Sequence, residues 1–390
     1  MSCCTPCSRQ VALDNLNRTS VVFAASATST AGVLVFALLP IFVGQIAGKY
    51  QLSESDAGLS ASAYFAIYAL VSLSAPLWIR RWSWRVVAIS GYLTMLIGLG
   101  LLYFSETHDN ALIALAITGA GAATLLPISL TLVSDMLDTE RIYAITIFAS
   151  QLIPALLLFG LSEGVLGAYG LDTTITASVV LTLICLALSY ALPTGQTSTK
   201  ASATTQGSAT SGLLSLLGLS LSFAGFASMW AFFEIIASQA GLPADFSSFW
   251  IAVGLLMTAV GSIVAAWLSD RWGRIPPMLV AIAIALLGSS LFTFGITTTS
   301  YAIALVIFPL AYYVALIYIL AIIADADPRG TYSSLMSFAL ALGAISGPAI
   351  YGYVREVAGP DTLVIVVLLL TGTVLSSWVQ HVLSRGKLAQ

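Results

Sequence analysis

Long apolar runs, separated by short polar segments, constrain this chain more than any other feature of its sequence. An α-helix needs about 20 predominantly apolar residues to cross the hydrocarbon core of a bilayer. Runs of about 18 to 25 residues recur along the whole chain and predict twelve transmembrane helices. The predicted spans are 19–43, 57–79, 84–104, 111–134, 142–164, 172–193, 213–237, 246–268, 276–296, 300–324, 331–353 and 361–383.

The composition agrees with a chain embedded in a membrane. Of the 390 residues, 58% are apolar and only 8% are charged, so a soluble globule would lack the polar surface to cover its core. The net charge is −3 and the cations are scattered over short loops, which excludes a nucleic-acid-binding face. We expect an integral, multi-pass, all-α protein in the lipid bilayer of a bacterial inner or cell membrane.

The positions of Lys and Arg predict the orientation, because cytoplasmic loops of membrane proteins are enriched in these residues. Twelve spans assign the loops to two alternating sides, and one side has only Lys49 and Arg355. The other side has Arg9, Arg18, Arg80, Arg81, Arg85, Arg141, Lys200, Arg271, Arg274, Arg329, Arg385 and Lys387. Both termini are therefore expected in the cytoplasm.

A Ser/Thr-rich segment without apolar periodicity, residues 194–211, is typical of a flexible linker. It separates six spans from six, which predicts one helix bundle over 19–193 and a second over 212–384. Residues 1–18 and 385–390 are expected to be cytoplasmic tails.

The two halves show signs of an internal repeat at an offset of 190 residues. The coincident positions are Arg81-Trp82 with Arg271-Trp272, Gly98 with Gly288, and Asp135 with Asp325. These identities are few, but they fall at matching topological positions. Many transporters are built from repeated halves, so the pattern favours a pseudo-symmetric transporter fold.

A polar hinge, AWLSDRWGRIPPM at residues 266–278, lies between two predicted spans. A tight polar turn of this kind belongs in a short loop at a membrane face, and its arginines mark the cytoplasmic side. A generic positively charged loop would explain the same residues, so the hinge is only moderately specific by itself.

The hinge resembles the loop signature of the major facilitator superfamily, in which a glycine, an acid, a basic residue, a second glycine and further basic residues recur between two helices. Asp270, Arg271, Gly273 and Arg274 match this signature, whereas Ala266 replaces the leading glycine. With twelve helices and a central linker, the resemblance covers nearly the whole chain. It implies two pseudo-symmetric six-helix bundles that rock around a central substrate site, with the charged loop acting as a gate.

The chain also departs from patterns of that family. In the first half, Arg80 and Ser83 stand at the positions equivalent to Asp270 and Gly273. Members resembling proton-driven drug antiporters carry an arginine in the fourth helix, where this chain has Leu115. These departures weaken the interpretation as a drug antiporter of that type.

No Lys or Arg lies in the interior of a predicted span, which argues against multiply anionic substrates such as phosphate esters or dicarboxylates. Aromatic and polar side chains are plentiful instead and suit neutral, amphipathic or cationic organic molecules. Each of them singly also fits a helix face packed on lipid or on another helix. The candidates for lining the substrate cavity are Tyr64, Tyr68, Gln151, Trp230, Tyr312 and Tyr313.

Two acids, Glu234 and Glu163, are candidates for proton coupling. Glu234 stands in an apolar stretch of the seventh span, and burial without a cationic partner favours the protonated form of a carboxyl group. The alternative is that Glu234 lies in the last outer turn and reaches water as an inert anion. Glu163 is flanked by glycines near the outer end of the fifth span, where a solvated loop position is the simpler interpretation.

Three of the four cysteines, Cys3, Cys4 and Cys7, crowd the polar N-terminus. Three thiols without a histidine or a fourth partner favour an inert tail over a soft-metal site. We expect no metal site and no cofactor, and we place a soft-metal or arsenical exporter last among the alternatives.

Together these features predict a secondary active transporter, working as a monomer, that moves a small neutral, amphipathic or cationic organic solute with proton coupling. The alternatives are a carrier of monocarboxylates or aromatic acids and a facilitated-diffusion uniporter. An intramembrane enzyme would need a catalytic set within the spans, and both histidines, His108 and His381, lie at loop or tail positions. A channel or a lipid scramblase would need neither a coupling residue nor an alternating gate.

Overall fold

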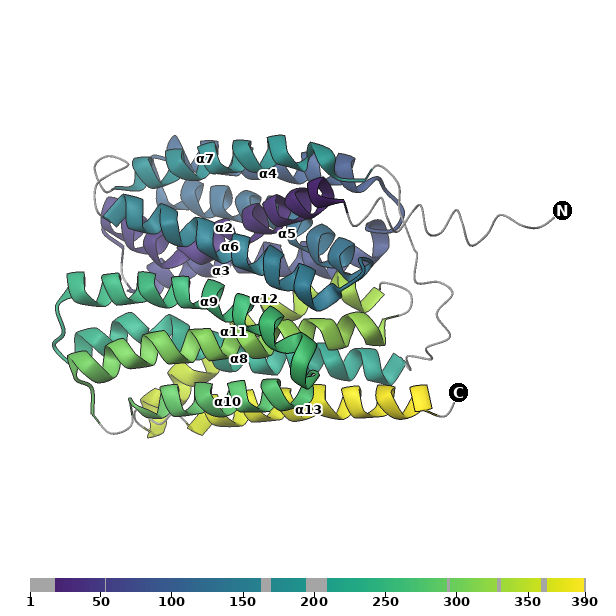
Figure 1. Cartoon of the computed structure of the whole chain (residues 1–390). Helices are drawn as coiled ribbons and strands as arrows, with labels where there is room; N and C mark the ends of the chain where they lie inside the picture. The colour runs from purple at the N-terminus through teal and green to yellow at the C-terminus, as the bar shows by residue number, and fades with distance from the viewer. Residues whose placement is uncertain are drawn as a thin grey trace. The chain divides into compact units, whose positions relative to one another are not determined.

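The computed structural model describes residues 18–52, 54–162, 170–193, 209–292, 295–327, 331–358 and 363–388. These residues form twelve α-helices, one short 3-10 helix and no strand (Figure 1). The elements are α2 Thr19–Tyr50, α3 Glu54–Trp78, α4 Trp84–Tyr103, α5 His108–Ser134, α6 Thr139–Ser162, α7 Leu171–Leu188, η1 Ser189–Ala191, α8 Ala209–Gln239, α9 Ala244–Trp272, α10 Ile275–Ser290, α11 Thr298–Ala326, α12 Thr331–Ala358 and α13 Leu363–Leu388.

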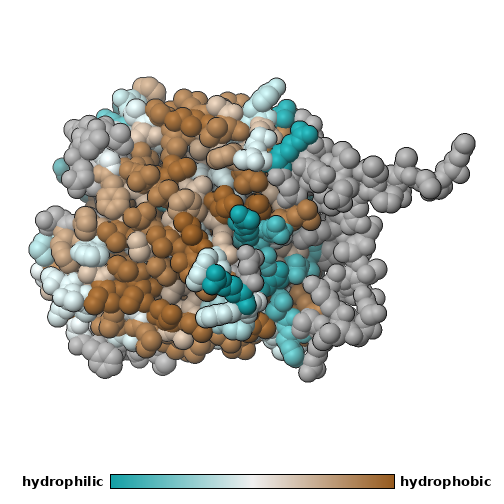
Figure 2. Space-filling model, in the orientation of Figure 1, coloured by the Kyte–Doolittle hydropathy of each residue, from teal (hydrophilic) through white to brown (hydrophobic). Residues whose placement is uncertain are grey.

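Each of the twelve predicted spans corresponds to one helix from α2 to α13, so the predicted all-α fold is confirmed. Among the described residues, nine helices are long and apolar enough to cross a membrane, and two shorter apolar helices cover Ala63–Trp78 and Ile275–Ser290. In the view of Figure 2 the side chains along the helices are mainly apolar, and hydrophilic side chains gather near helix ends. This distribution is what a lipid-facing surface requires.

Several helices extend beyond the predicted spans, because polar residues outside the hydrocarbon core can continue a helix that an apolar segment has started. Helix α2 runs on to Tyr50, and α13 runs to Leu388, into the predicted C-terminal tail. Helix α8 begins at Ala209, so residues 209–211 of the predicted linker lie in this helix. The rest of the predicted linker lies outside the described residues.

The chain divides into two compact units. The first unit contains α2 to α5, α7 and η1, with the ends of α6 and the start of α12 up to Phe338. The second contains Tyr143–Ala155 of α6, then α8 to α11, the remainder of α12 and α13. The bundle boundaries 19–193 and 212–384 remain a prediction.

In the first unit, α5 is the central helix and packs against α2, α3 and α4. Small residues let the backbones of these helices come close together. A Cβ built on Gly121 of α5 would lie 2.6 Å from the carbonyl oxygen of Gly91 in α4. The Ser129 hydroxyl of α5 donates a hydrogen bond of 2.9 Å to the Ala25 carbonyl of α2. The C-terminal half of α5 is buried along its whole circumference, which holds the residue that follows it in a defined place.

In the second unit, α11 has the same central position and packs against α8, α9 and α10 (Figure 1). Helix α8 packs against α13, as α2 packs against α7 in the first unit. A Cβ built on Gly372 of α13 would lie 2.5 Å from the Gly218 carbonyl oxygen of α8, so this pair is also closely packed. These helix pairs occur at corresponding places in the two units, and the correspondence supports the internal repeat inferred at an offset of 190 residues.

Candidate functional site

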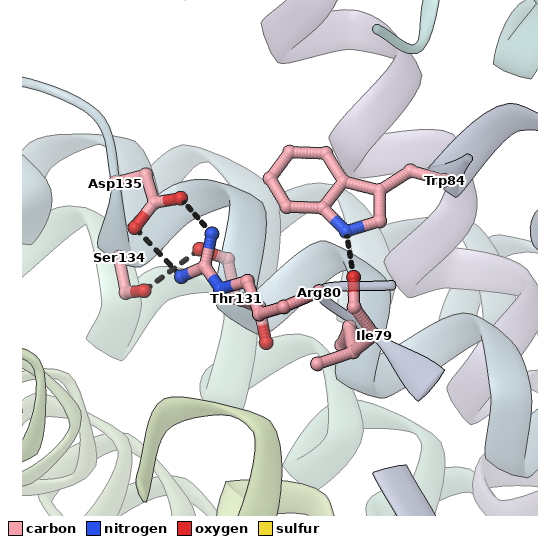
Figure 3. Close-up of polar contacts among 6 residues, drawn as sticks. All are labelled: Ile79, Arg80, Trp84, Thr131, Ser134 and Asp135. Carbon is pink, nitrogen blue, oxygen red and sulfur yellow. Dashed lines mark hydrogen bonds and ion pairs between the residues drawn. The ribbon is translucent and has the colours of Figure 1, made fainter. Parts of the chain in front are cut away.

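The first candidate feature is an ion pair in the first unit between Arg80, which follows α3, and Asp135 at the end of α5 (Figure 3). The guanidinium donates two hydrogen bonds, one from Nη1 to Oδ2 and one of 2.9 Å from Nη2 to Oδ1. The Asp135 side chain is only 3% exposed and that of Arg80 is 19% exposed. A buried carboxylate with a two-pronged arginine partner is a strong, directional contact.

The local structure explains why Asp135 needs this arginine. Asp135 is the C-cap of α5, and the C-terminus of a helix carries a partial negative charge that repels a carboxylate. The guanidinium offsets most of this negative charge at the point where α5 ends. Arg80 is in turn held beside Trp84, whose ring centroid lies 5.6 Å from Cζ of Arg80, and the Trp84 indole donates to the Ile79 carbonyl at 2.7 Å.

The second unit has a related ion pair at the corresponding helix junction, and only its acid occupies the same repeat position. Arg274, at the start of α10, donates a hydrogen bond of 2.9 Å to Asp325 in the last turn of α11. The two side chains are 18% and 27% exposed, so this pair is more open to water than the Arg80 pair. Gly273 lies between α9 and α10 with φ of 69°, a backbone conformation that glycine adopts without strain. The glycine therefore allows the turn that brings Arg274 to Asp325.

The predicted gating loop is thus only partly described. Gly273 and Arg274 lie in the turn and the ion pair, whereas Arg271 is exposed and stacks on Trp267, with Cζ 4.5 Å from the ring centroid. The Asp270 side chain lies outside the described residues. Their gating role stays a prediction.

Sequence reasoning did not include Arg80, Asp135 or Asp325 among the site residues. The repeat signal could have found the two acids, because they coincide at the offset of 190. The arginines give no such signal, since the residue that coincides with Arg80 is Asp270.

Three of the predicted cavity residues lie in one aromatic cluster of the second unit, which we define as Trp230, Phe226, Phe308, Tyr312 and Tyr313. Phe226 of α8 stands at its centre. Its ring stacks on Tyr312 at 4.6 Å, on Phe308 at 5.6 Å and on Trp230 at 5.7 Å between centroids. Tyr313 meets the Phe226 ring edge-on at 5.5 Å.

Burial differs across this cluster. Tyr312 is fully buried and Tyr313 is 4% exposed, whereas the Trp230 side chain is half-buried. The Tyr312 hydroxyl lies 3.4 Å from the Ser222 hydroxyl of α8. The stack therefore has a packed inner part on α11 and one ring, Trp230, with an accessible surface.

The other cavity candidates lie elsewhere. Tyr64 and Tyr68 are neighbours on α3 in the first unit, with ring centroids 5.8 Å apart, and both are buried. The Tyr64 hydroxyl has no hydrogen-bond partner among the described residues. Gln151 is buried in the part of α6 that groups with the second unit. These residues remain candidates.

The two proton-coupling candidates are not described in full. Glu163 lies outside the described residues, and Glu234 lies within α8 but its side chain is outside them. Cys3, Cys4 and Cys7 are also outside them. Within the described part of the chain, no group of three or more His, Cys, Asp or Glu side chains is placed to hold a metal ion.

Comparisons with known proteins add to this geometry. The sequence profile described as Major Facilitator Superfamily matches residues 21–348. Comparison with curated protein sequences finds no match.

Solved structures share the fold at low sequence identity. The Major Facilitator Superfamily transporter FucP in the outward conformation is 15% identical with a TM-score of 0.69, over 94% of this chain and 99% of FucP. A variant of the E. coli fucose:proton symporter FucP is also 15% identical, with a TM-score of 0.68 over 93% of this chain and 99% of the symporter. The proton:xylose symporter XylE, bound to 6-bromo-6-deoxy-D-glucose, is 11% identical, with a TM-score of 0.69 over 96% of each chain.

Proposed function

The chain belongs to the Major Facilitator Superfamily, and we propose that it moves a small neutral, amphipathic or cationic organic solute across the membrane by proton-coupled alternating access. Membership of this family makes it a multi-pass membrane transporter and not an enzyme. The substrate class, the coupling ion and the gating residues are the parts that we propose.

The aromatic cluster around Phe226 carries the proposal for the substrate class. Its inner rings hold Trp230 in place, because Phe226 stacks on Trp230 from one side and on Tyr312 at 4.6 Å. A ring that is already ordered loses little entropy when a ligand stacks on it. The face of an indole attracts cations and apolar ring systems and offers nothing to a multiply charged anion.

A ligand panel tests this class directly. Thermal unfolding of the purified protein would be followed with organic cations, neutral polyols, monocarboxylates and dicarboxylates, since a ligand of the folded state raises its apparent stability. We expect stabilisation by cations or neutral molecules and none by dicarboxylates. Stabilisation by dicarboxylates alone would refute the proposed class.

The role of Trp230 can be tested by measuring the affinity of Trp230 variants for the ligand that the panel identifies. Trp230→Ala should weaken binding by about 0.5–2 kcal/mol, the range for a cation over an aromatic ring, while Trp230→Phe should keep most of the affinity. Trp378→Ala in α13 is the matched control, because Trp378 lies outside the cluster and is 49% exposed. Equal losses in the Trp230 and Trp378 variants would remove Trp230 from the binding site.

Proton coupling is proposed through Glu234. It occupies an apolar stretch of α8, four residues after Trp230, so a helical turn connects it with the proposed substrate ring. A carboxyl group in an apolar environment can exchange a proton as its access to water changes. Glu234→Gln should abolish uptake driven by a pH gradient and preserve exchange of labelled for unlabelled substrate.

Two outcomes would contradict this assignment. If Glu234→Gln still concentrates substrate when only a pH gradient is imposed, Glu234 is not the proton carrier, and Glu163→Gln becomes the variant to measure. If the unaltered protein shows exchange but no response to a pH gradient, the protein is a facilitated-diffusion uniporter.

A further inference from the structure

Arginines gather near the junction between the second and third helices of each unit, and their surroundings differ. In the first unit Arg80 is bound to Asp135 and Arg85 donates to the Leu192 carbonyl oxygen at 2.8 Å, and in the second unit Arg274 is bound to Asp325. The remaining arginines at the two junctions, Arg81 and Arg271, are both exposed. Neither has a carboxylate partner among the described residues.

Both exposed arginines stand beside exposed tryptophans. Trp82 follows Arg81 and is 62% exposed, and Trp272 follows Arg271 and is 64% exposed. Trp267, one turn before Arg271, is 59% exposed and lies under its guanidinium, with Cζ 4.5 Å from the ring centroid. Large aromatic rings left open in this way are costly in bulk water, but they are stable where a membrane meets water.

The exposed arginine and tryptophan recur at the same position of the internal repeat, which argues against a chance surface feature. Arg81-Trp82 and Arg271-Trp272 coincide at the offset of 190, so the same exposed pair lies near the junction between the second and third helices of each unit. The loop charges predict the cytoplasmic side for both pairs, and residues at the ends of spans on that side meet the lipid headgroups. The inner leaflet carries anionic lipids, which attract basic residues next to a span.

We propose that Arg81 with Trp82, and Arg271 with Trp267 and Trp272, are two binding sites for the headgroup of an anionic phospholipid. The planar guanidinium matches a phosphate with two parallel hydrogen bonds, and a lysine could not reproduce that geometry. The indole rings lie among the headgroups and the upper acyl chains and keep the arginine at that depth. The proposal goes beyond the transport function and does not depend on it.

Binding can be measured on the purified full-length protein by native mass spectrometry, with phosphatidylglycerol and phosphatidylcholine of the same acyl chains as the probes. Arg81→Gln and Arg271→Gln should each weaken phosphatidylglycerol binding at one site about tenfold or more, because each variant loses two charge-assisted hydrogen bonds to the bound phosphate. The double variant should lose the preference for phosphatidylglycerol over phosphatidylcholine at both sites. Arg81→Lys and Arg271→Lys should retain part of it, because the charge stays and the second hydrogen bond is lost.

Arg141→Gln is the matched control, since Arg141 is another exposed arginine on the same predicted side and has no tryptophan next to it in the sequence. It removes the same charge and should leave phosphatidylglycerol binding unchanged. Thermal unfolding of each variant verifies that it is folded. A loss in Arg141→Gln equal to that in Arg81→Gln, or wild-type binding in the double variant, would overturn the proposal.

A competition with inorganic phosphate separates a lipid site from a site for free phosphate. At a lipid site the acyl chains and the tryptophans add to the affinity for phosphatidylglycerol, so millimolar inorganic phosphate should not displace this lipid. Displacement of phosphatidylglycerol by millimolar phosphate would overturn the assignment to a lipid headgroup.

Discussion

The two arginine–aspartate pairs predict very different losses of stability when the arginine is removed. Arg80→Gln leaves Asp135, whose side chain is 3% exposed, as a buried carboxylate without its two-pronged partner at a helix C-terminus. Breaking a buried pair in this way costs about 3–5 kcal/mol, and the 19% exposure of Arg80 places the expected loss near the lower end of that range. Arg274→Gln leaves Asp325, which is 27% exposed and can be hydrated, so we expect a loss of about 1 kcal/mol or less.

The assay is the free energy of unfolding in mixed detergent micelles, measured for both variants under the same conditions. The repeat supplies the matched control, because the same substitution is made at the corresponding helix junction of each unit, and the acid partners Asp135 and Asp325 share a repeat position. The double variant Arg80→Gln with Asp135→Asn should recover much of the loss, since it also removes the buried carboxylate charge that Arg80 no longer offsets. Equal losses for Arg80→Gln and Arg274→Gln, or no recovery in the double variant, would refute the reasoning from burial.

Three further predictions concern the packing of α4 and α5, the gating loop and the N-terminal cysteines. Gly121→Ala should destabilise the protein by about 1–3 kcal/mol, because the new Cβ would lie 2.5 Å from the Met95 backbone nitrogen. Gly100→Ala is the control: nothing lies within 4 Å of its new Cβ, so it should be neutral or stabilising in the same unfolding assay. A larger loss in Gly100→Ala than in Gly121→Ala would contradict the close packing of α4 and α5. Asp270→Asn should lower the rate of transport and leave substrate affinity nearly intact, as measured by initial rates and equilibrium binding, and a variant that loses only binding would count against a gating role. Replacing Cys3, Cys4 and Cys7 together with serine should leave transport unchanged, whereas loss of resistance to arsenite in cells would favour the soft-metal exporter.

Hydropathy predicted the helices well because each must bury an apolar stretch of bilayer length, and this requirement acts on every span separately. Helix ends were harder to predict, as at Ala209 and Leu388, because the bilayer imposes no limit on a helix once it has left the hydrocarbon core. The ring contact between Tyr64 and Tyr68 follows from their spacing, since residues four apart meet on one helix face.

Contacts between different helices could not be predicted from the sequence pattern. Asp135 and Asp325 share a repeat position, but their arginine partners come from positions four residues apart in the repeat, and only the path of the chain between the helices decides which arginine reaches the acid. Phe226 was not a candidate, although it is the ring on which Trp230 and Tyr312 both stack. Periodicity places a ring on a helix but does not say which ring of another helix it meets.

Counterflow in proteoliposomes tests the central claim most directly. Vesicles loaded with the unlabelled ligand found by the thermal panel would be diluted into a trace of the labelled ligand, with no pH gradient and no ATP. Alternating access predicts a transient accumulation of label above its outside concentration, which Trp230→Ala should reduce and Trp378→Ala should not. Simple equilibration of the label without an overshoot would contradict a carrier and would favour a channel.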